Sequence, residues 1–374
     1  MGRDLPRALG AARRRPACPS RGDPPRSTPA AHAGGWTARQ RGRHPVTRLS
    51  ATWAVLTLAL GAAVALSFLV GEGDLSDEGL RGTLLRLRAW RLANTVLAGA
   101  ALAGAGVLVQ GLFRNPLASP SILGTSAGAT LGGVLVLVLW NTLLAAHLDW
   151  LPPELVLPAG CLLGAWASLM VLLTVTGRGA SIITVLLTGF ILSSLFLSLG
   201  SLLMSLAQNT WEMGRAVVAF TLGGVDAKGP RHAALALPLV AVTSCVAMGW
   251  SRHLDLLLSG EEEAQSLGVD VDAARRWIIV WASTLTAAAV AIGGNVAFVG
   301  LVVPHALRPF TGPEHRLLIP AALVGGAAFL TGADVLTRVL PTAGAVPLGV
   351  VTGLVGAPLF LVLLARASRE GRIA

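Results

Sequence analysis

The sequence predicts an all-α polytopic membrane protein, with about ten transmembrane helices and with both termini in the cytoplasm. Two properties predict this class: 53% of the residues are hydrophobic and 13% are charged, and the mean hydropathy is +0.69. A water-soluble domain carries about 25% charged residues, so this chain has too few charges to cover its surface in water. Apolar windows of about 20 residues, the length that crosses a bilayer, recur along the chain.

Residues 1–48 are predicted to form a disordered basic tail ahead of a membrane domain that covers residues 49–369. This tail contains eleven arginines among many Pro, Gly and Ala residues and shows no apolar period. It either holds its end of the first helix in the cytoplasm or reflects a start site assigned too early. The first apolar run, residues 51–70, is too long and too far from the N-terminus for a secretion signal.

Ten apolar segments are predicted to span the membrane. The third and the eighth adjoin Gly and Pro residues, and the eighth is short. Because ten is even, both ends lie on one side, and the arginines near both ends identify that side as the cytoplasm. The segments are residues 50–70, 92–113, 122–141, 154–176, 182–207, 232–250, 275–294, 296–310, 317–337 and 347–366.

Composition also excludes several functions. The formal net charge is +10, but outside the tail the arginines lie at the ends of apolar segments, which indicates membrane topology rather than a nucleic-acid-binding face. The single lysine, Lys228 in "VDAKGP", does not fit the Gly-Lys-Ser/Thr of a nucleotide-binding loop. The three cysteines are far apart. We therefore expect no catalytic site, no metal site and no bound cofactor.

Residues 111–128, "GLFRNPLASPSILGTSAG", interrupt the helical pattern between two apolar runs. Asn115-Pro116 and Ser119-Pro120 forbid a continuous helix, because proline lacks the donor and restricts the residue before it. Either the segment is a turn at the cytoplasmic surface, or it is irregular backbone that faces protein or a path inside the bundle. Further on, Gly124, Gly128 and Gly132 recur at a spacing that favours close packing of two helices.

Residues 259–276, "SGEEEAQSLGVDVDAARR", predict a short helix in a cytoplasmic loop. Ser259 and Glu262 have the spacing of a capping box, and Gly268 can end the helix in the left-handed conformation. Asp272 is then expected to cap the next membrane helix. The alternative is a solvated loop helix with no partner.

Four ordered stretches resemble the FecCD-like family, the iron–siderophore and cobalamin permeases of bacterial ABC importers. They are "QGLFRNPLASPSILGTSAGA" (110–129), "GEEEAQSLGVDV" (260–271), "FVGLVVPHALRPFTGPEHRLLIP" (298–320) and "ADVLTRVLPTAGAVPLGVVTGLVGAPLFLVLL" (333–364). The resemblance covers about residues 50–367.

This resemblance implies a homodimeric permease of the bacterial inner membrane. Two separate ATPase subunits, which bind ATP and Mg, would drive it, and an extracytoplasmic binding protein would deliver the ligand. The implied cargo is a ferric siderophore, with cobalamin or haem as alternatives. An alternative of another class, an ion-driven secondary transporter, is disfavoured because the predicted span interiors hold almost no ionisable residue.

The resemblance also implies roles for particular residues. Arg88 and Arg91 in "RAWR", where Trp90 replaces the family's proline, and Arg338 match basic positions that dock the binding protein; the alternative is anchoring to lipid headgroups. Ser181 and Ile182 match a cytoplasmic gate, or are simply the start of a helix. Asn295 has no role that the sequence explains. The segment implied to couple to the ATPase is Glu261, Glu262, Glu263, Ala264, Gln265, Ser266, Leu267 and Gly268, and the structural motif is Asn115, Pro116, Pro120, Gly124 and Gly128.

Overall fold

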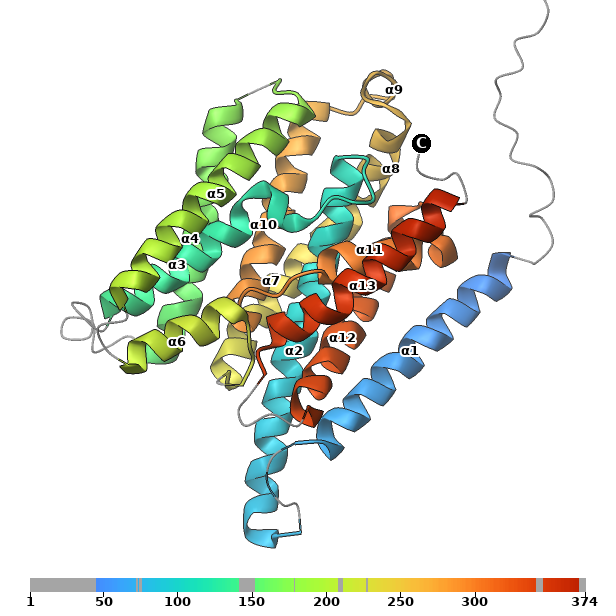
Figure 1. The fold of residues 1–374 in the computed structure, drawn as a ribbon. Coiled ribbons are helices and arrows are strands. Elements are labelled where there is room, and N and C mark those ends of the chain that lie inside the picture. The colour runs from blue at the N-terminus through green and yellow to red at the C-terminus, as the bar shows by residue number, and fades with distance from the viewer. Residues whose placement is uncertain are drawn as a thin grey trace, which may run out of the picture. The chain divides into compact units, whose positions relative to one another are not determined.

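The computed structural model describes residues 45–71, 73, 76–140, 152–177, 179–207, 211–226, 228–340 and 346–369. Residues 1–44 of the predicted tail lie outside the described residues. Its last four residues do not belong to a tail, because the first helix begins at Pro45. Throughout the part that the structure describes, every regular element is a helix (Figure 1), which confirms the predicted class.

The helices follow one another along the chain with short connections. Two of them, α6 and α8, lie where the sequence predicted loops. The elements are α1 (Pro45–Leu69), α2 (Glu78–Leu112), the 3-10 helix η2 (Pro120–Leu123), α3 (Thr125–Leu139), α4 (Pro153–Thr176), α5 (Ile182–Ala207), α6 (Trp211–Leu222), α7 (Pro230–Gly249), α8 (Ser251–Ser259), α9 (Glu261–Ser266), α10 (Val271–Gly293), α11 (Val299–Thr311), α12 (His315–Val339) and α13 (Leu348–Arg369).

Eight of the described helices are long and apolar enough to cross a membrane. The predicted third and eighth spans differ from the rest, because α3 has 15 residues and α11 has 13. At 1.5 Å per residue these helices are about 20 Å long, which is short of the roughly 30 Å of hydrocarbon. Within the described residues, each of these two predicted spans is a short helix preceded by irregular backbone, while the other eight reach the length of a membrane span.

The second helix is longer than predicted at its N-terminal end. It begins at Glu78 rather than near residue 92 and has 35 residues, which corresponds to about 52 Å. Asp77 caps it by accepting a 2.9 Å hydrogen bond from the backbone N–H of Gly79. The first turns of α2 project beyond the other helices at the end of the bundle opposite α9 (Figure 1).

Glycines let α2 lie at the centre of the bundle against α10, α11 and α12. A Cβ added at Gly106 would lie 1.8 Å from the carbonyl oxygen of Gly300 in α11, and one added at Gly99 would lie 2.3 Å from that of Gly326 in α12. These distances require backbone-to-backbone contact, which only glycine permits here. Small residues are the usual means of close helix packing in lipid, where no hydrophobic effect draws helices together.

Close backbone contact at glycines also joins α3 to α4, as the glycine spacing predicts. A Cβ at Gly132 would lie 2.2 Å from the carbonyl oxygen of Gly160, and one at Gly164 would lie 2.2 Å from that of Gly128. Gly124 has a different role from the one predicted. It precedes α3 with φ +81° and ends η2 in the left-handed conformation, so it shapes the turn rather than the helix face.

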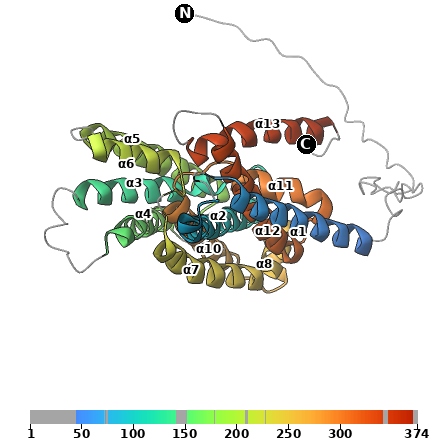
Figure 2. The ribbon, with the colours of Figure 1, turned by 90° about the horizontal axis from the view of Figure 1, so that it is seen from below.

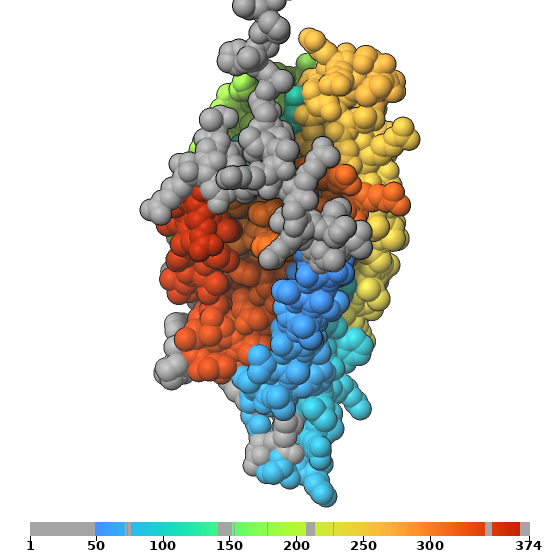
Figure 3. Space-filling view, turned by 90° about the vertical axis from the view of Figure 1, so that its right-hand side faces the viewer, coloured from blue at the N-terminus to red at the C-terminus, as the bar shows by residue number. Residues whose placement is uncertain are grey.

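Helices at the periphery differ greatly from the central ones in burial. In the apolar 18-residue stretch of α10, 78% is buried inside the chain, whereas in the corresponding stretch of α5 the buried share is 17%. Figure 2 shows α5 and α13 on one long side of the bundle and α7 and α8 on the other. Figure 3 shows α1, in blue, on the surface beside the orange-red C-terminal helices. The exposed apolar faces of these helices are suited to lipid or to another protein chain.

Candidate coupling and transport sites

The predicted coupling segment forms the short helix α9 between two glycines. Gly260 precedes it with φ +133° and Gly268 follows it with φ +85°. Ala264 is fully buried and anchors the helix, while Glu262, Glu263 and Leu267 are exposed. A short helix is therefore confirmed here, with an apolar and acidic surface facing outward.

The predicted caps of this region were wrong by a few residues. Ser259 is the last residue of α8, and Gly260 stands at the N-cap of α9 without any side-chain cap. Asp270, rather than Asp272, caps α10 by accepting a 2.9 Å hydrogen bond from the backbone N–H of Ala273. Gly268 has the left-handed conformation that was predicted.

Glu261 differs from the two acids after it because it binds two arginines. Its Oε1 accepts a 2.8 Å hydrogen bond from Nη2 of Arg275, at the start of α10, and a 3.2 Å hydrogen bond from Nη2 of Arg114, just after α2. The coupling segment is thereby tied to two other elements by charge-assisted hydrogen bonds. The sequence alone gave no sign of this pairing, because Arg114 lies 147 positions before Glu261.

Arg275 extends the connection to the predicted gate. Its Nη1 donates to the carbonyl oxygen of Ala180, in the turn between α4 and α5. The next residue, Ser181, accepts a 3.1 Å hydrogen bond at Oγ from the backbone N–H of Thr184, so it caps α5, and Ile182 is the first residue of that helix. The structure thus brings the predicted gate and the predicted coupling segment to one end of the molecule. The gate role itself stays a prediction.

The motif that interrupts the second and third predicted spans combines both of the alternatives left open by the sequence. Arg114, with φ +49°, and Asn115 form an exposed turn, in which Asn115 Oδ1 accepts a 2.9 Å hydrogen bond from the backbone N–H of Leu117. Pro120 is buried inside the bundle against Gly300. Pro116, between these parts, is partly buried. The irregular backbone therefore starts at the surface and continues between packed helices.

A hollow of about 300 Å³ with a mostly apolar wall lies where η2, α3 and α5 meet, and Asn295 contributes to its lining. Apolar groups complete its wall, and Phe190 of α5 is the largest of them. Its polar residues are all uncharged: Ser121, Ser126, Thr130, Ser193 and Asn295. Asn295, for which the sequence explained no role, therefore lies at the wall of this hollow.

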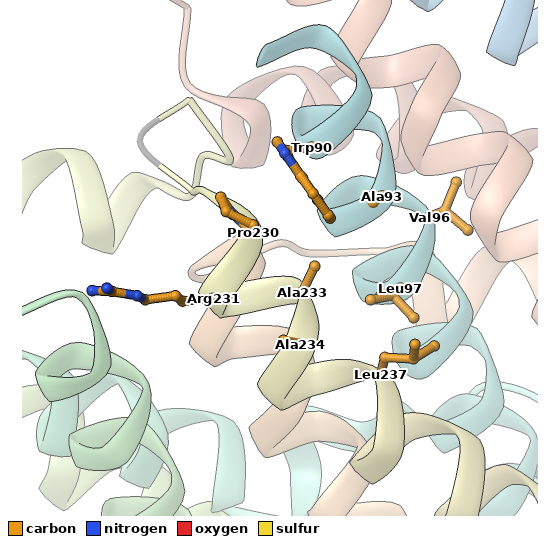
Figure 4. Close-up of a pocket in the computed structure, with 9 residues that line it drawn as sticks. All are labelled: Trp90, Ala93, Val96, Leu97, Pro230, Arg231, Ala233, Ala234 and Leu237. Atoms are coloured by element: carbon orange, nitrogen blue, oxygen red, sulfur yellow. The ribbon is translucent and has the colours of Figure 1, made fainter. Parts of the chain in front are cut away.

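A larger groove of about 580 Å³ lies between α2 and α7 and differs in character. Figure 4 shows Trp90 and Leu97 of α2 facing Ala233 and Leu237 of α7 across it, while the side chain of Arg231 points away. Nearly all of its wall is apolar, so it lacks the convergent polar groups that orient a ligand. Trp90, which replaces the family's proline, forms part of this wall.

The three predicted docking arginines gather at the end of the bundle opposite α9. Arg88 Nη1 donates to the carbonyl oxygen of Phe68 at 2.6 Å, and Arg338 Nη1 donates to that of Ser67 at 3.0 Å. These carbonyls belong to the last turn of α1, where positive charge is favourable. Arg91 and Arg338 both pair with the buried Asp334. Docking of a binding protein stays a prediction; the structure adds an internal role.

An unpredicted pair joins α8 to α12. Asp255 Oδ1 accepts hydrogen bonds from the backbone N–H of His315 at 2.8 Å and lies 2.7 Å from its Nδ1. Burial raises the pKa of Asp255, but the hydrogen bonds from His315 outweigh it and hold that pKa below its ordinary value of 3.8. The carboxylate is therefore charged at neutral pH and caps α12 from another helix. Its contribution to stability is lost only as the pH falls through the lowered pKa.

No group of three or more His, Cys, Asp or Glu side chains that could hold a metal ion occurs within the described ranges. His305 and Arg308 of α11, which the sequence placed at the end of a helix, do not form such a group. Arg308 Nη2 instead donates a 3.2 Å hydrogen bond to Oε1 of the buried Gln110, whose amide donates at 3.2 Å to the carbonyl oxygen of Leu301. These contacts satisfy polar groups beside the irregular start of α11.

Comparison with known proteins identifies the class of this chain. The profile of the FecCD transport family matches residues 48–366. The cobalamin import system permease protein BtuC of Halobacterium salinarum is 38% identical over 86% of this chain and 81% of its own. The Fe(3+) dicitrate transport system permease protein FecD of Escherichia coli is 37% identical over 76% of this chain and 85% of its own.

A solved structure agrees with these relatives. An ABC transporter assigned to the metal-chelate type, in an inward-facing conformation, superposes with a TM-score of 0.74 at 29% identity, over 86% of this chain and 99% of its own. The chain belongs to the FecCD transport family. It is a multi-pass permease subunit of an ABC importer, and permeases of this family work with ATPase and substrate-binding partners.

Proposed function

We propose that two copies of this chain form the passage of an importer for a metal chelate in the bacterial inner membrane. Support comes from family membership and from the relatives named for cobalamin and for Fe(3+) dicitrate, since both cargoes are metal complexes. A ferric siderophore is the proposed cargo, with cobalamin or haem as alternatives. The passage itself binds no cofactor, and the partner ATPase binds ATP and Mg.

The observation that carries the proposal is the uncharged hollow between η2, α3 and α5, in which hydroxyl groups and one amide interrupt a mostly apolar wall. A passage for a bulky chelate needs polar groups that exchange hydrogen bonds with the cargo and water without holding a charged group tightly. The described wall meets that requirement with four hydroxyls and one amide and without an ionisable side chain. Its position beside α5, the least buried of the eight candidate spans, suits a path that a second copy completes.

Filling the hollow tests this assignment. Ser193→Leu should lower uptake about tenfold or more without loss of assembly, because the added side chain occupies the wall and removes a hydroxyl. Thr57→Leu, on the exposed surface of α1, is the matched control: both hydroxyls bond to the carbonyl four residues earlier, but Thr57 does not line the hollow. Uptake is measured in vesicles that contain the ATPase and the binding protein, with a radiolabelled ferric siderophore and with radiolabelled cobalamin. Equal uptake by both variants would contradict the assignment.

We further propose that α8 and α9 dock onto the ATPase at the cytoplasmic side. The fully buried Ala264 fixes α9 to the bundle, and the exposed Leu267, Glu262 and Glu263 supply an apolar and acidic contact surface. Interfaces of this kind combine an apolar anchor with charges that set partner and orientation. Glu261 contributes less to this surface, because its carboxylate is bound to Arg114 and Arg275.

A further inference from the structure

Three segments that are far apart in the sequence are joined at the α9 end of the molecule by one group of charges. Glu261 stands at the first position of α9, Arg114 follows the end of α2, and Arg275 lies in the first turns of α10. Arg275 also reaches the turn that precedes α5. We call Glu261, Arg114, Arg275 and the carbonyl group of Ala180 the charged link.

Arg275 holds the central position in this link. Its side chain is 11% exposed, whereas those of Glu261 and Arg114 are 37% and 35% exposed. The planar guanidinium uses one terminal nitrogen for Ala180 and the other for Glu261, a forked geometry that a lysine cannot reproduce. A nearly buried charge with two fixed acceptors resists displacement more than an exposed pair does.

The two segments that Arg275 joins are bounded by glycines that have no neighbours at the Cβ position. Gly177 and Gly179, with φ +64° and +76°, precede Ala180, and Gly260 and Gly268 flank α9. A Cβ added at any of the four would find no atom within 4 Å. Packing at these four glycines therefore does not tie the two segments together, whereas the hydrogen bonds of Arg275 join them directly.

We propose that Arg275 is a positioning residue for transport, which transmits displacement of α9 to the start of α5. An ATPase that moves α9 displaces Glu261. Arg275 follows it and pulls on the carbonyl group of Ala180, next to the Ser181 cap of α5. Arg114 conveys the same displacement to the segment between α2 and α3. This inference rests on the proposed function, because it assumes that the ATPase acts on α9.

The decisive experiment compares cargo uptake with ATP hydrolysis in the complete complex. Permease, ATPase and binding protein are reconstituted in vesicles, with radiolabelled cobalamin or a radiolabelled ferric hydroxamate, whichever the wild type takes up. Arg275→Gln should assemble with the ATPase and hydrolyse ATP at the wild-type rate, but uptake per ATP should fall about tenfold, the effect of losing a hydrogen bond to a charged group. Glu261→Gln should give a similar fall, and the double variant should lose no more than either single variant.

A neighbouring arginine supplies the control. Arg276→Gln alters a side chain that forms no ion pair with any described residue, and uptake per ATP should stay within about twofold of wild type. Three results would each overturn the inference. Uptake per ATP could stay at the wild-type value in Arg275→Gln, or the double variant could lose as much as the two single losses combined. The third is a loss of ATPase binding that parallels the loss of uptake. If the wild type takes up neither these two probes nor haem, the proposed function fails instead.

Discussion

Asp334 shows how one buried acid organises an end of the molecule. Its side chain is 1% exposed and pairs with Arg91, through Nη2 at 2.8 Å, and with Arg338 of its own helix. The pair with Arg338, four residues away, follows from helical spacing. The pair with Arg91 does not, because 243 positions separate the two residues. Together these contacts hold α12 against α2.

Neutralising this acid should destabilise the protein. In Asp334→Asn both arginines lose their buried counter-charge, and breaking a buried pair costs about 3–5 kcal/mol. The free energy of unfolding in detergent, or the melting temperature, measures the loss. Asp226→Asn is the control: Asp226 also pairs with Arg91, but its side chain is 49% exposed, so its loss should cost at most about 1 kcal/mol. Equal losses in the two variants would show that burial does not set the strength of these pairs.

At the scale of single elements, α9 offers a test of ATPase docking that leaves the charged link in place. Glu262→Lys combined with Glu263→Lys reverses two exposed charges, so we expect less ATPase to copurify, because the acidic surface no longer complements its partner. Glu78→Lys, at the N-terminal end of α2 on the opposite side of the bundle, is a control that should copurify normally. Normal copurification of the double reversal would contradict docking at this surface.

The extension of α2 changes the expected docking site of the binding protein. Arg88 and Arg338 are bound to the last turn of α1, whereas Arg81 and Arg86 of the same extension are exposed. Arg81→Glu with Arg86→Glu should therefore weaken association of the binding protein at low salt, mainly through a slower on-rate. The control, Arg252→Glu in α8, reverses an exposed charge near the α9 end. An unchanged dissociation constant in the double variant would exclude this extension as the docking site.

Sequence analysis predicted best those helices that a long apolar stretch alone identifies as membrane spans. Eight of the ten predicted spans correspond to helices long enough to cross a membrane, because composition alone sets that property. The sequence already set the third and eighth segments apart, because both adjoin Gly and Pro residues and the eighth is short, but it did not locate where α3 and α11 begin. The caps were misplaced because neighbouring residues can each serve as a cap and only the backbone conformation decides between them: Gly260 rather than Ser259 precedes α9, and Asp270 rather than Asp272 caps α10.

For the whole molecule, burial identifies the face whose apolar surface the chain itself does not cover. The helices α2, α10 and α12 fill the centre, while α5 and α13 lie together on one long side (Figure 2) and bury little of their apolar surface inside the chain. The hydroxyls of Ser194, Ser198 and Ser201 in α5 each donate to the carbonyl group four residues earlier. This face is thus compatible with an apolar neighbour. The hollow at Ser193 opens beside it, so a second copy placed here would enclose a path.

A cysteine placed at the start of α5 tests that arrangement and the gate together. In a background without the native cysteines, Ser181→Cys should cross-link two copies in some nucleotide states and not in others, because the proposed coupling through the charged link would move this residue when the ATPase moves α9. Val242→Cys, on the exposed face of α7 across the bundle, should give no cross-link in any state. Cross-linking is measured by gel mobility in membranes that contain the ATPase. If Ser181→Cys gives no cross-link in any nucleotide state, the predicted gate role of this residue is contradicted. Cross-linking through Val242→Cys instead would place the second copy on the α7 side.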